Sequence, residues 1–92
     1  MSALSQRLRA AADAPRLADH VRASNMDGTV KWRKGPEAIF CIRQGAHGWG
    51  AFEIAEGSLM YAGAALTHGC YKRESAIRAG LLALAERLEA QP

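Results

Sequence analysis

The middle of the chain decides the fold, and residues 29–54 read TVKWRKGPEAIFCIRQGAHGWGAFEI. The first five of these residues alternate between apolar and polar side chains, with Val30 and Trp32 on one face, which is typical of a half-buried strand. Residues 38–43 are apolar on both faces, as in a central strand, and residues 49–54 form a third strand. Short glycine-containing turns join the three segments, so we expect an antiparallel meander.

Working outward, residues 59–62 predict a weaker fourth strand, and residues 72–90 repeat apolar side chains at helical spacing. The apolar stripe of this helix consists of Ile77, Leu81, Leu84 and Leu88. Gly80 borders the stripe and predicts that the helix lies close to the sheet. We expect the helix to cover a sheet face formed by Phe40, Ile42, Phe52 and Ile54.

The N-terminal third reads as two short helices. Ser2 can cap the first, which places Leu4 and Leu8 on one stripe. Pro15 begins a second helix over residues 15–23, in which Leu17 would pair with Val21. We expect these helices at an edge of the sheet or on the face that the C-terminal helix leaves open.

The sequence therefore predicts a single α+β domain over residues 1–92, in the order α-α-β-β-β-(β)-α. The N-terminal helices occupy residues 1–24, an antiparallel meander of three or four strands occupies residues 29–64, and the long C-terminal helix occupies residues 71–90. A chain of 92 residues fits one domain. Its thin core leaves little room for a deep pocket, which favours binding over catalysis.

Composition bounds the function further. Hydrophobic residues make up 49% and charged residues 23% of the chain, which argues against disorder. The net charge of +3 and the pI near 9.2 exclude a DNA mimic and allow nucleic acid or an anionic protein as partner. The two cysteines, the absence of an apolar run of membrane-spanning length and the absence of a signal-peptide pattern lead us to expect a cytoplasmic protein.

Two cations open the C-terminal helix, Lys72 and Arg73. The helix dipole favours negative charge at this end, so the sequence breaks a local rule there. Exposed amides and two cations at a helix start predict a site for a phosphate or an acidic group. In the alternative interpretation, Glu74 and solvent offset the small cost and no ligand is involved.

A second basic set lies on the strands. Lys31, Arg33 and Arg43 fall on the predicted sheet face opposite the C-terminal helix. On this assignment the same face carries Ile39, Cys41, Trp49 and Ala51. Such a mixture suits stacking on nucleic acid, or an interface anchored by tryptophan and arginine. Alternatively, Trp49 is core beneath the N-terminal helices. Leu82 points away from the helix stripe and would extend an interface.

The soft metal ligands of the chain are Cys41, His47, His68 and Cys70. Their spacing matches no common zinc motif, so we expect no metal and no cofactor. His68 and Cys70 would be the candidates for a base and a nucleophile, but no orienting carboxylate is evident beside them. We therefore predict no catalytic residues.

Residues 38–88 resemble the YegP-like domains of unknown function. The similar segments are IFCI at 39–42, WGAF at 49–52 and GCYKRESAIRAG at 69–80. The resemblance implies a β-meander followed by a helix. Because modules of that family often occur in tandem pairs, it also implies a homodimer for this single module, and it carries over no catalytic residues.

The order helix, three strands, helix is also similar to the double-stranded RNA-binding domain. Gly35 and Pro36 resemble the loop between the first strands of that family, and Lys72 and Arg73 followed by Ala76 resemble its basic helix start. This similarity implies contact with RNA phosphates. Ala38 and Ile77 stand where the family has histidine and lysine.

Together these features predict a small non-enzymatic protein that docks on a protein or nucleoprotein partner. The expected partner-binding residues are Lys31, Arg33, Arg43, Trp49, Lys72 and Arg73. A phage-type inhibitor, such as an anti-CRISPR that blocks a guide-RNA complex, has this size and charge. The alternative is a module that binds RNA or DNA directly, through the basic sheet face and the start of the last helix.

Overall fold

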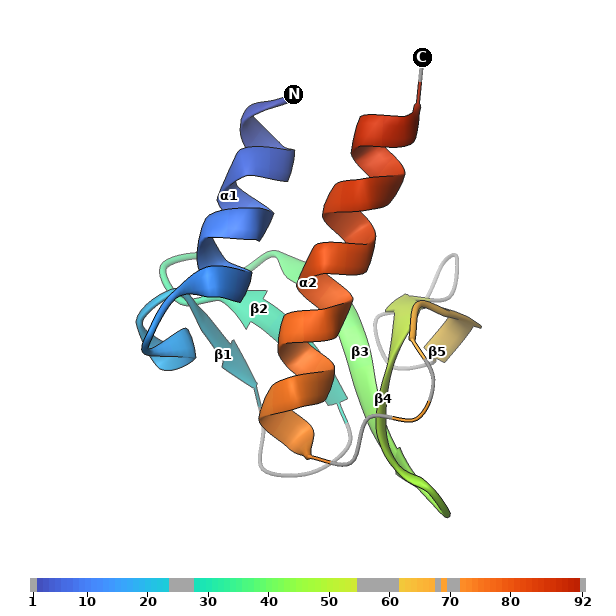
Figure 1. Ribbon diagram of the computed structural model, residues 1–92. Coiled ribbons are helices and arrows are strands. Elements are labelled where there is room, and N and C mark those ends of the chain that lie inside the picture. The colour runs from blue at the N-terminus through green and yellow to red at the C-terminus, as the bar shows by residue number, and fades with distance from the viewer. Residues whose placement is uncertain (1, 24–27, 55–61, 68, 70–71, 92) are drawn as a thin grey trace.

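The computed structural model describes residues 2–23, 28–54, 62–67, 69 and 72–91 (Figure 1). Its helices and strands follow one another in the order α1 (Ala3–Asp13), the 3-10 turn η1 (Leu17–Asp19), β1 (Val21–Ala23), β2 (Gly28–Trp32), β3 (Ala38–Gly45), β4 (Gly48–Ile54), β5 (Ala62–Ala65) and α2 (Arg73–Ala90). The predicted α+β class is confirmed. No helix within these residues is both long and apolar enough to cross a lipid bilayer.

The sheet is an antiparallel meander in which each strand pairs with the next along the chain. Five strands lie within the described residues, so the predicted number of three to four is low. The extra strand is β1. The predicted strand at 59–62 lies almost wholly outside the described residues, and β5 begins at Ala62.

Residues 15–23 do not form the predicted second helix. One 3-10 turn buries Leu17, and β1 follows directly, with Val21 buried and Arg22 exposed. Leu17 and Val21 are both buried, as they would be on one face of a helix. In the structure Val21 is buried for a different reason, because alternate residues of a strand face the core. Pairing with β2 favours the strand over the helix in this segment. Next to this pairing, the Arg33 N–H donates to the His20 carbonyl oxygen at 2.9 Å.

Both helices lie on one face of the sheet, where they run side by side (Figure 1). The Ser2 hydroxyl caps α1 by accepting the Ser5 N–H at 3.0 Å, as its sequence predicts. Leu8 is buried, whereas Leu4 is 46% exposed. The expectation that the N-terminal helices lie at an edge or on the open face is therefore wrong for α1, which shares the core with α2.

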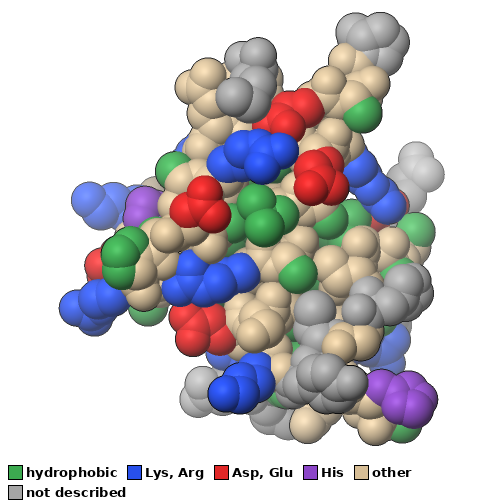
Figure 2. All heavy atoms as spheres, in the orientation of Figure 1, with side chains coloured by type: hydrophobic (Ala, Val, Ile, Leu, Met, Phe, Trp, Pro, Cys, Tyr) green, Lys and Arg blue, Asp and Glu red, His purple; other side chains and the backbone are tan. Residues whose placement is uncertain are grey.

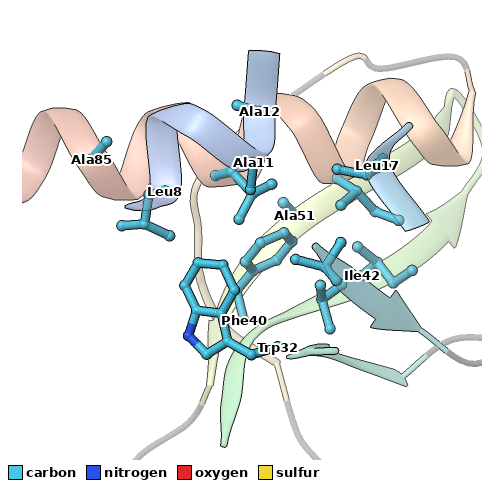
Figure 3. Close-up of a cluster of buried hydrophobic side chains, with 13 residues drawn as sticks. Leu8, Ala11, Ala12, Leu17, Trp32, Phe40, Ile42, Ala51 and Ala85 are labelled. Carbon is cyan, nitrogen blue, oxygen red and sulfur yellow. The ribbon is translucent and has the colours of Figure 1, made fainter. Parts of the chain in front are cut away.

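The core lies between the helices and the sheet, where Phe40 and Trp32 point from the sheet toward the helices (Figure 3). The buried residues of α2 are Ala76, Ile77, Gly80, Leu81 and Ala85. Leu82 is half-buried and packs against this core, so it does not extend an open interface. Gly80 allows the predicted close approach, because a Cβ there would lie 2.8 Å from the ring of Phe40.

The phase of β4 differs from the prediction. Cys41 pairs with Phe52 and Ile42 pairs with Ala51. Since paired residues share a face, Phe52 and, two residues on, Ile54 lie opposite the helices. Ala51 is instead fully buried beneath α2. The helix-covered face thus contains Phe40 and Ile42 as predicted, but not Phe52 or Ile54.

A register shift changes the placement of Ile39 as well. Val30 pairs with Phe40, whereas the next residue, Lys31, pairs with Ala38. A bulge of this kind interrupts the alternation of faces. Ile39 consequently packs against the helix-side core and does not share the open face with Cys41.

Candidate partner-binding site

Several arginines serve the fold. The Arg9 guanidinium bonds both carboxylate oxygens of Glu89, at 2.8 and 2.6 Å, and so ties α1 to α2. This pairing raises the pKa of Arg9 and lowers that of Glu89. Arg87 pairs with Glu53 of β4. Basic and acidic side chains consequently alternate over the helices (Figure 2), which limits the net charge of that surface.

Arg78 caps the C-terminal end of α1. Its Nη1 donates to the carbonyl oxygens of Ala12 and Ala14 at 2.7 and 2.6 Å, which the helix itself leaves without partners. Its Nη2 pairs with Glu74 at 3.0 Å. The Arg7 guanidinium stacks over the Trp32 ring at 3.9 Å from the centroid. The guanidinium groups of Arg7 and Arg78 thus already have partners within the molecule.

Three other arginines contribute to the lining of one groove. Arg22 comes from β1, Arg33 directly follows β2, and Arg73 is the first residue of α2. They line a hollow of about 440 Å³ between β1 and the first turns of α2, which we call the arginine groove. Its remaining lining residues are Leu17, Ala18, Val21, Ala23, Glu74 and Ile77. The groove therefore combines cations with apolar side chains.

Main-chain contacts hold two of these arginines without neutralising them. Arg33 donates from Nη1 to the Ala18 carbonyl oxygen at 3.1 Å, and Arg22 donates from Nη2 to the Gly35 carbonyl oxygen at 2.9 Å. Glu74 is the one acidic residue in the described lining, and it is already paired with Arg78. The groove consequently keeps an excess of positive charge.

Arg73 is the least satisfied of the three. Its Nε and Nη2 are buried, and within the described residues neither donates a hydrogen bond. Its Cζ lies 5.7 Å from the centroid of the Trp49 ring, so a cation–π contact is its visible partner. A buried guanidinium nitrogen without an acceptor is costly. A carboxylate or a phosphate could supply the missing acceptors if the Arg73 side chain turned toward the groove.

Lys72 occupies the N-cap position of α2 without capping it. Its backbone is extended, and its carbonyl oxygen accepts the first helical bond from Ala76 at 3.0 Å. No side-chain bond caps the helix at this residue. Serine or aspartate would be favoured here for stability. Lysine at this position therefore contributes no side-chain cap to α2.

Replacing Lys72 with serine is expected to raise the free energy of unfolding by about 1 kcal/mol, because the hydroxyl can accept an N–H of the first turn. Lys72→Ala removes the same charge without supplying a cap and should give no such gain. Urea denaturation of the three proteins measures the difference. Equal stabilities for the serine and alanine variants would contradict the interpretation.

The structure brings together four of the six predicted site residues. Arg33 and Arg73 line the groove, Trp49 contacts Arg73, and Lys72 precedes it in the chain. Trp49 lies on the helix side of the sheet, because it shares a face with Ala51. It therefore does not lie on the open face, and it is partly buried against the core beside Arg73 of α2.

The other two predicted residues lie elsewhere. Lys31 faces away from the helices, opposite Arg22 in the β1–β2 pair. Arg43 also faces away, at the β3–β4 hairpin, where it lines a separate hollow of about 300 Å³ with His47. Arg22 is absent from the predicted site residues, because residues 15–23 were predicted to form a helix. The apolar–basic–apolar alternation of Val21, Arg22 and Ala23 is the sequence signal that could have identified it.

Cys41 lies on the sheet face opposite the helices and is buried, and this burial raises the pKa of its thiol. The nearby Arg43 guanidinium acts in the opposite direction and to a smaller extent. In the part of the chain that the structure describes, no three histidine, cysteine or acidic side chains are placed to hold a metal ion. The other two members of the soft-ligand set, His68 and Cys70, lie outside the described residues.

The resemblances to the YegP-like domains and to the double-stranded RNA-binding domain stay predictions, because no matching protein family tests them. The function of the arginine groove is therefore inferred from its own residues. Comparison of the chain with protein-family models, with curated proteins and with solved structures finds no match.

Proposed function

We propose that this chain is a small non-enzymatic binding protein that docks on a protein or nucleoprotein partner through the arginine groove and the start of α2. The observation that carries the proposal is the buried guanidinium of Arg73, whose Nε and Nη2 lack acceptors within the described residues. A phage-type inhibitor, such as an anti-CRISPR, is one protein of this kind. The partner contributes an anionic group to the groove.

The lining of the groove favours docking over catalysis. Its lining includes arginine and apolar residues, which suit anchoring of a partner, since arginine is enriched at binding hot spots. Acid–base or nucleophilic chemistry requires a poised titratable group. Glu74, the one carboxylate in the described lining, is held by Arg78.

Direct binding of RNA or DNA is the second candidate function. It is favoured by the Arg22–Lys31 pair, in which two cations stand directly opposite each other on neighbouring strands. Such like-charge pairs destabilise a sheet, and nucleic acid would offset the repulsion. Binding of this kind should weaken steeply with salt, because phosphate-bound counterions are released.

Affinity capture from a bacterial lysate tests the proposal. The bait proteins are the wild type, Lys72→Glu/Arg73→Glu, and a control, Arg16→Glu/Lys34→Glu, that carries the same change in net charge outside the groove lining. We expect a discrete protein or nucleoprotein complex that persists after nuclease treatment. Its recovery should fall at least tenfold with the groove variant and remain near the wild-type level with the control.

Two outcomes would contradict docking. If the bait retains nucleic acid alone, and nuclease or moderate salt removes it, the chain is a nucleic-acid-binding module. If both double variants capture the same proteins as the wild type, the arginine groove does not carry the interaction.

A further inference from the structure

Within the described residues, the outer edge of β1 pairs with no other strand and faces the arginine groove. β1 is the first strand of the described sheet and pairs there with β2. All three of its residues, Val21, Arg22 and Ala23, line the groove. The groove is thus bounded on one side by a strand edge and on the other by the first turns of α2.

The hydrogen-bond pattern shows which main-chain groups face outward. His20 accepts a bond from Arg33 of the neighbouring segment. In an antiparallel ladder, residues bonded to the neighbouring strand alternate with residues directed away from it. The main-chain N–H and C=O groups of Arg22 therefore point toward β2. Those of Val21 and Ala23 point away from β2, toward the groove. Within the described residues, no hydrogen bond outside the sheet ladder involves either residue.

The opposite side of the groove supplies charge and an apolar surface. Arg73 brings a guanidinium whose Nε and Nη2 donate no hydrogen bond within the described residues, and Ile77 lies one turn further along α2. Leu17 and Arg33 complete the surroundings. An occupant that fits must offer main-chain groups to β1, an anion to Arg73 and an apolar side chain between Leu17 and Ile77.

We propose that the groove binds an extended acidic segment of the partner protein, which adds to the sheet along the outer edge of β1. This inference rests on the proposed function and names the chemistry of its partner. Main-chain bonds to Val21 and Ala23 provide affinity, and a carboxylate of the segment pairs with Arg73. β1 spans only about 10 Å, so three or four residues of the segment form the pairing.

The charge pattern favours an acidic peptide over nucleic acid. A nucleic acid carries phosphates but no peptide groups to complete a strand edge. Ion pairs such as Arg9–Glu89 and Arg87–Glu53 also break up the basic surface over the helices. A local cationic groove with an apolar floor matches a short acidic segment, whereas a phosphate backbone requires a continuous basic track.

The probe for this proposal is an acetylated and amidated eight-residue peptide in which valine and glutamate alternate. It is titrated into the full ¹⁵N-labelled chain and followed by NMR. We expect the amide signals of Val21 and Ala23 to shift and their hydrogen exchange to slow. A peptide with lysine in place of glutamate and a twelve-nucleotide single-stranded DNA should not reproduce these changes.

Two variants separate the main-chain and charge contributions. Ala23→Pro removes an outward N–H without removing a bond to β2, because proline is tolerated on the open side of an edge strand. Ala23→Val keeps that N–H and is its matched control. Arg73→Gln removes the charge. We expect Ala23→Pro and Arg73→Gln each to weaken peptide binding about tenfold or more, and Ala23→Val to bind as the wild type does.

The proposal is overturned if the Val21 and Ala23 amides do not respond to the glutamate peptide, or if the lysine peptide or the DNA gives the same response. Should Ala23→Pro fail to fold, the hydrogen exchange of the wild-type Val21 and Ala23 amides and the titration of Arg73→Gln still test the proposal. Lysate capture separates the two proposals. If Ala23→Pro is folded and captures the wild-type partner while Lys72→Glu/Arg73→Glu does not, docking stands and strand addition falls. If both capture it, both proposals fall.

Discussion

Replacing Phe40 with alanine is expected to lower the free energy of unfolding by about 3–5 kcal/mol. Phe40 is fully buried on the central strand β3, beneath α2. Its removal costs the transfer free energy of the ring and leaves a cavity that the sheet and helix cannot close. Domains of this size are typically stable by about 5–15 kcal/mol, so the variant should lie close to its unfolding threshold.

Urea denaturation followed by tryptophan fluorescence measures this loss, and Phe52→Ala is the matched control. The chemical change is identical, but Phe52 is only half-buried and lies on the sheet face opposite the helices. We expect a clearly smaller loss for the control. Equal losses at the two positions would contradict the β3–β4 register and the placement of Phe52.

The error at β4 shows what hydrophobicity alone cannot decide. Residues 49–54 offer two faces, and the face containing Phe52 and Ile54 is the more apolar. The structure buries the other face at Ala51, because α2 approaches through Gly80 and leaves room for a methyl group only. The large side chain that fills the space between the sheet and α2 is Phe40 on the neighbouring strand. Such complementarity between distant segments has no local signature in the sequence.

The first strand was missed for a related reason. In a segment as short as residues 15–23, the spacing of apolar residues fits a helix and a strand equally well, since Leu17 and Val21 would share a face in either. Pairing with β2 supplies the deciding energy, and that partner lies beyond the local window. Longer segments carried enough repeats to be predicted, as the apolar stripe of α2 around Ile77 and Leu81 shows.

The candidate site was predicted in part. Arg73 and Lys72 were identifiable because cations at a helix start break a local electrostatic rule. Arg22 and Arg9 look alike in the sequence, yet one lines the arginine groove and the other pairs with Glu89, 80 residues away. Only the fold separates arginines that stabilise the structure from those left for a partner.

Gly80→Ala is expected to destabilise the protein, although alanine is the better helix former. A Cβ at this position would lie 2.8 Å from the Ala51 Cβ and 2.8 Å from two ring atoms of Phe40. Both neighbours are fully buried, so neither can move without disturbing the core. Overpacking of this kind costs about 1–3 kcal/mol, against a gain in helix propensity of about 1 kcal/mol. We expect a net loss in urea denaturation.

A double-mutant cycle with Phe40→Leu tests the cause of this loss. Leucine removes the ring atoms that crowd position 80, so Gly80→Ala should cost less in the Phe40→Leu background than in the wild type. The remaining contact with Ala51 keeps the rescue partial. If Gly80→Ala instead stabilises the wild type by the propensity gain alone, α2 lies further from β3 and β4 than the structure places it. In that case the close approach through Gly80 would not account for the burial of Ala51.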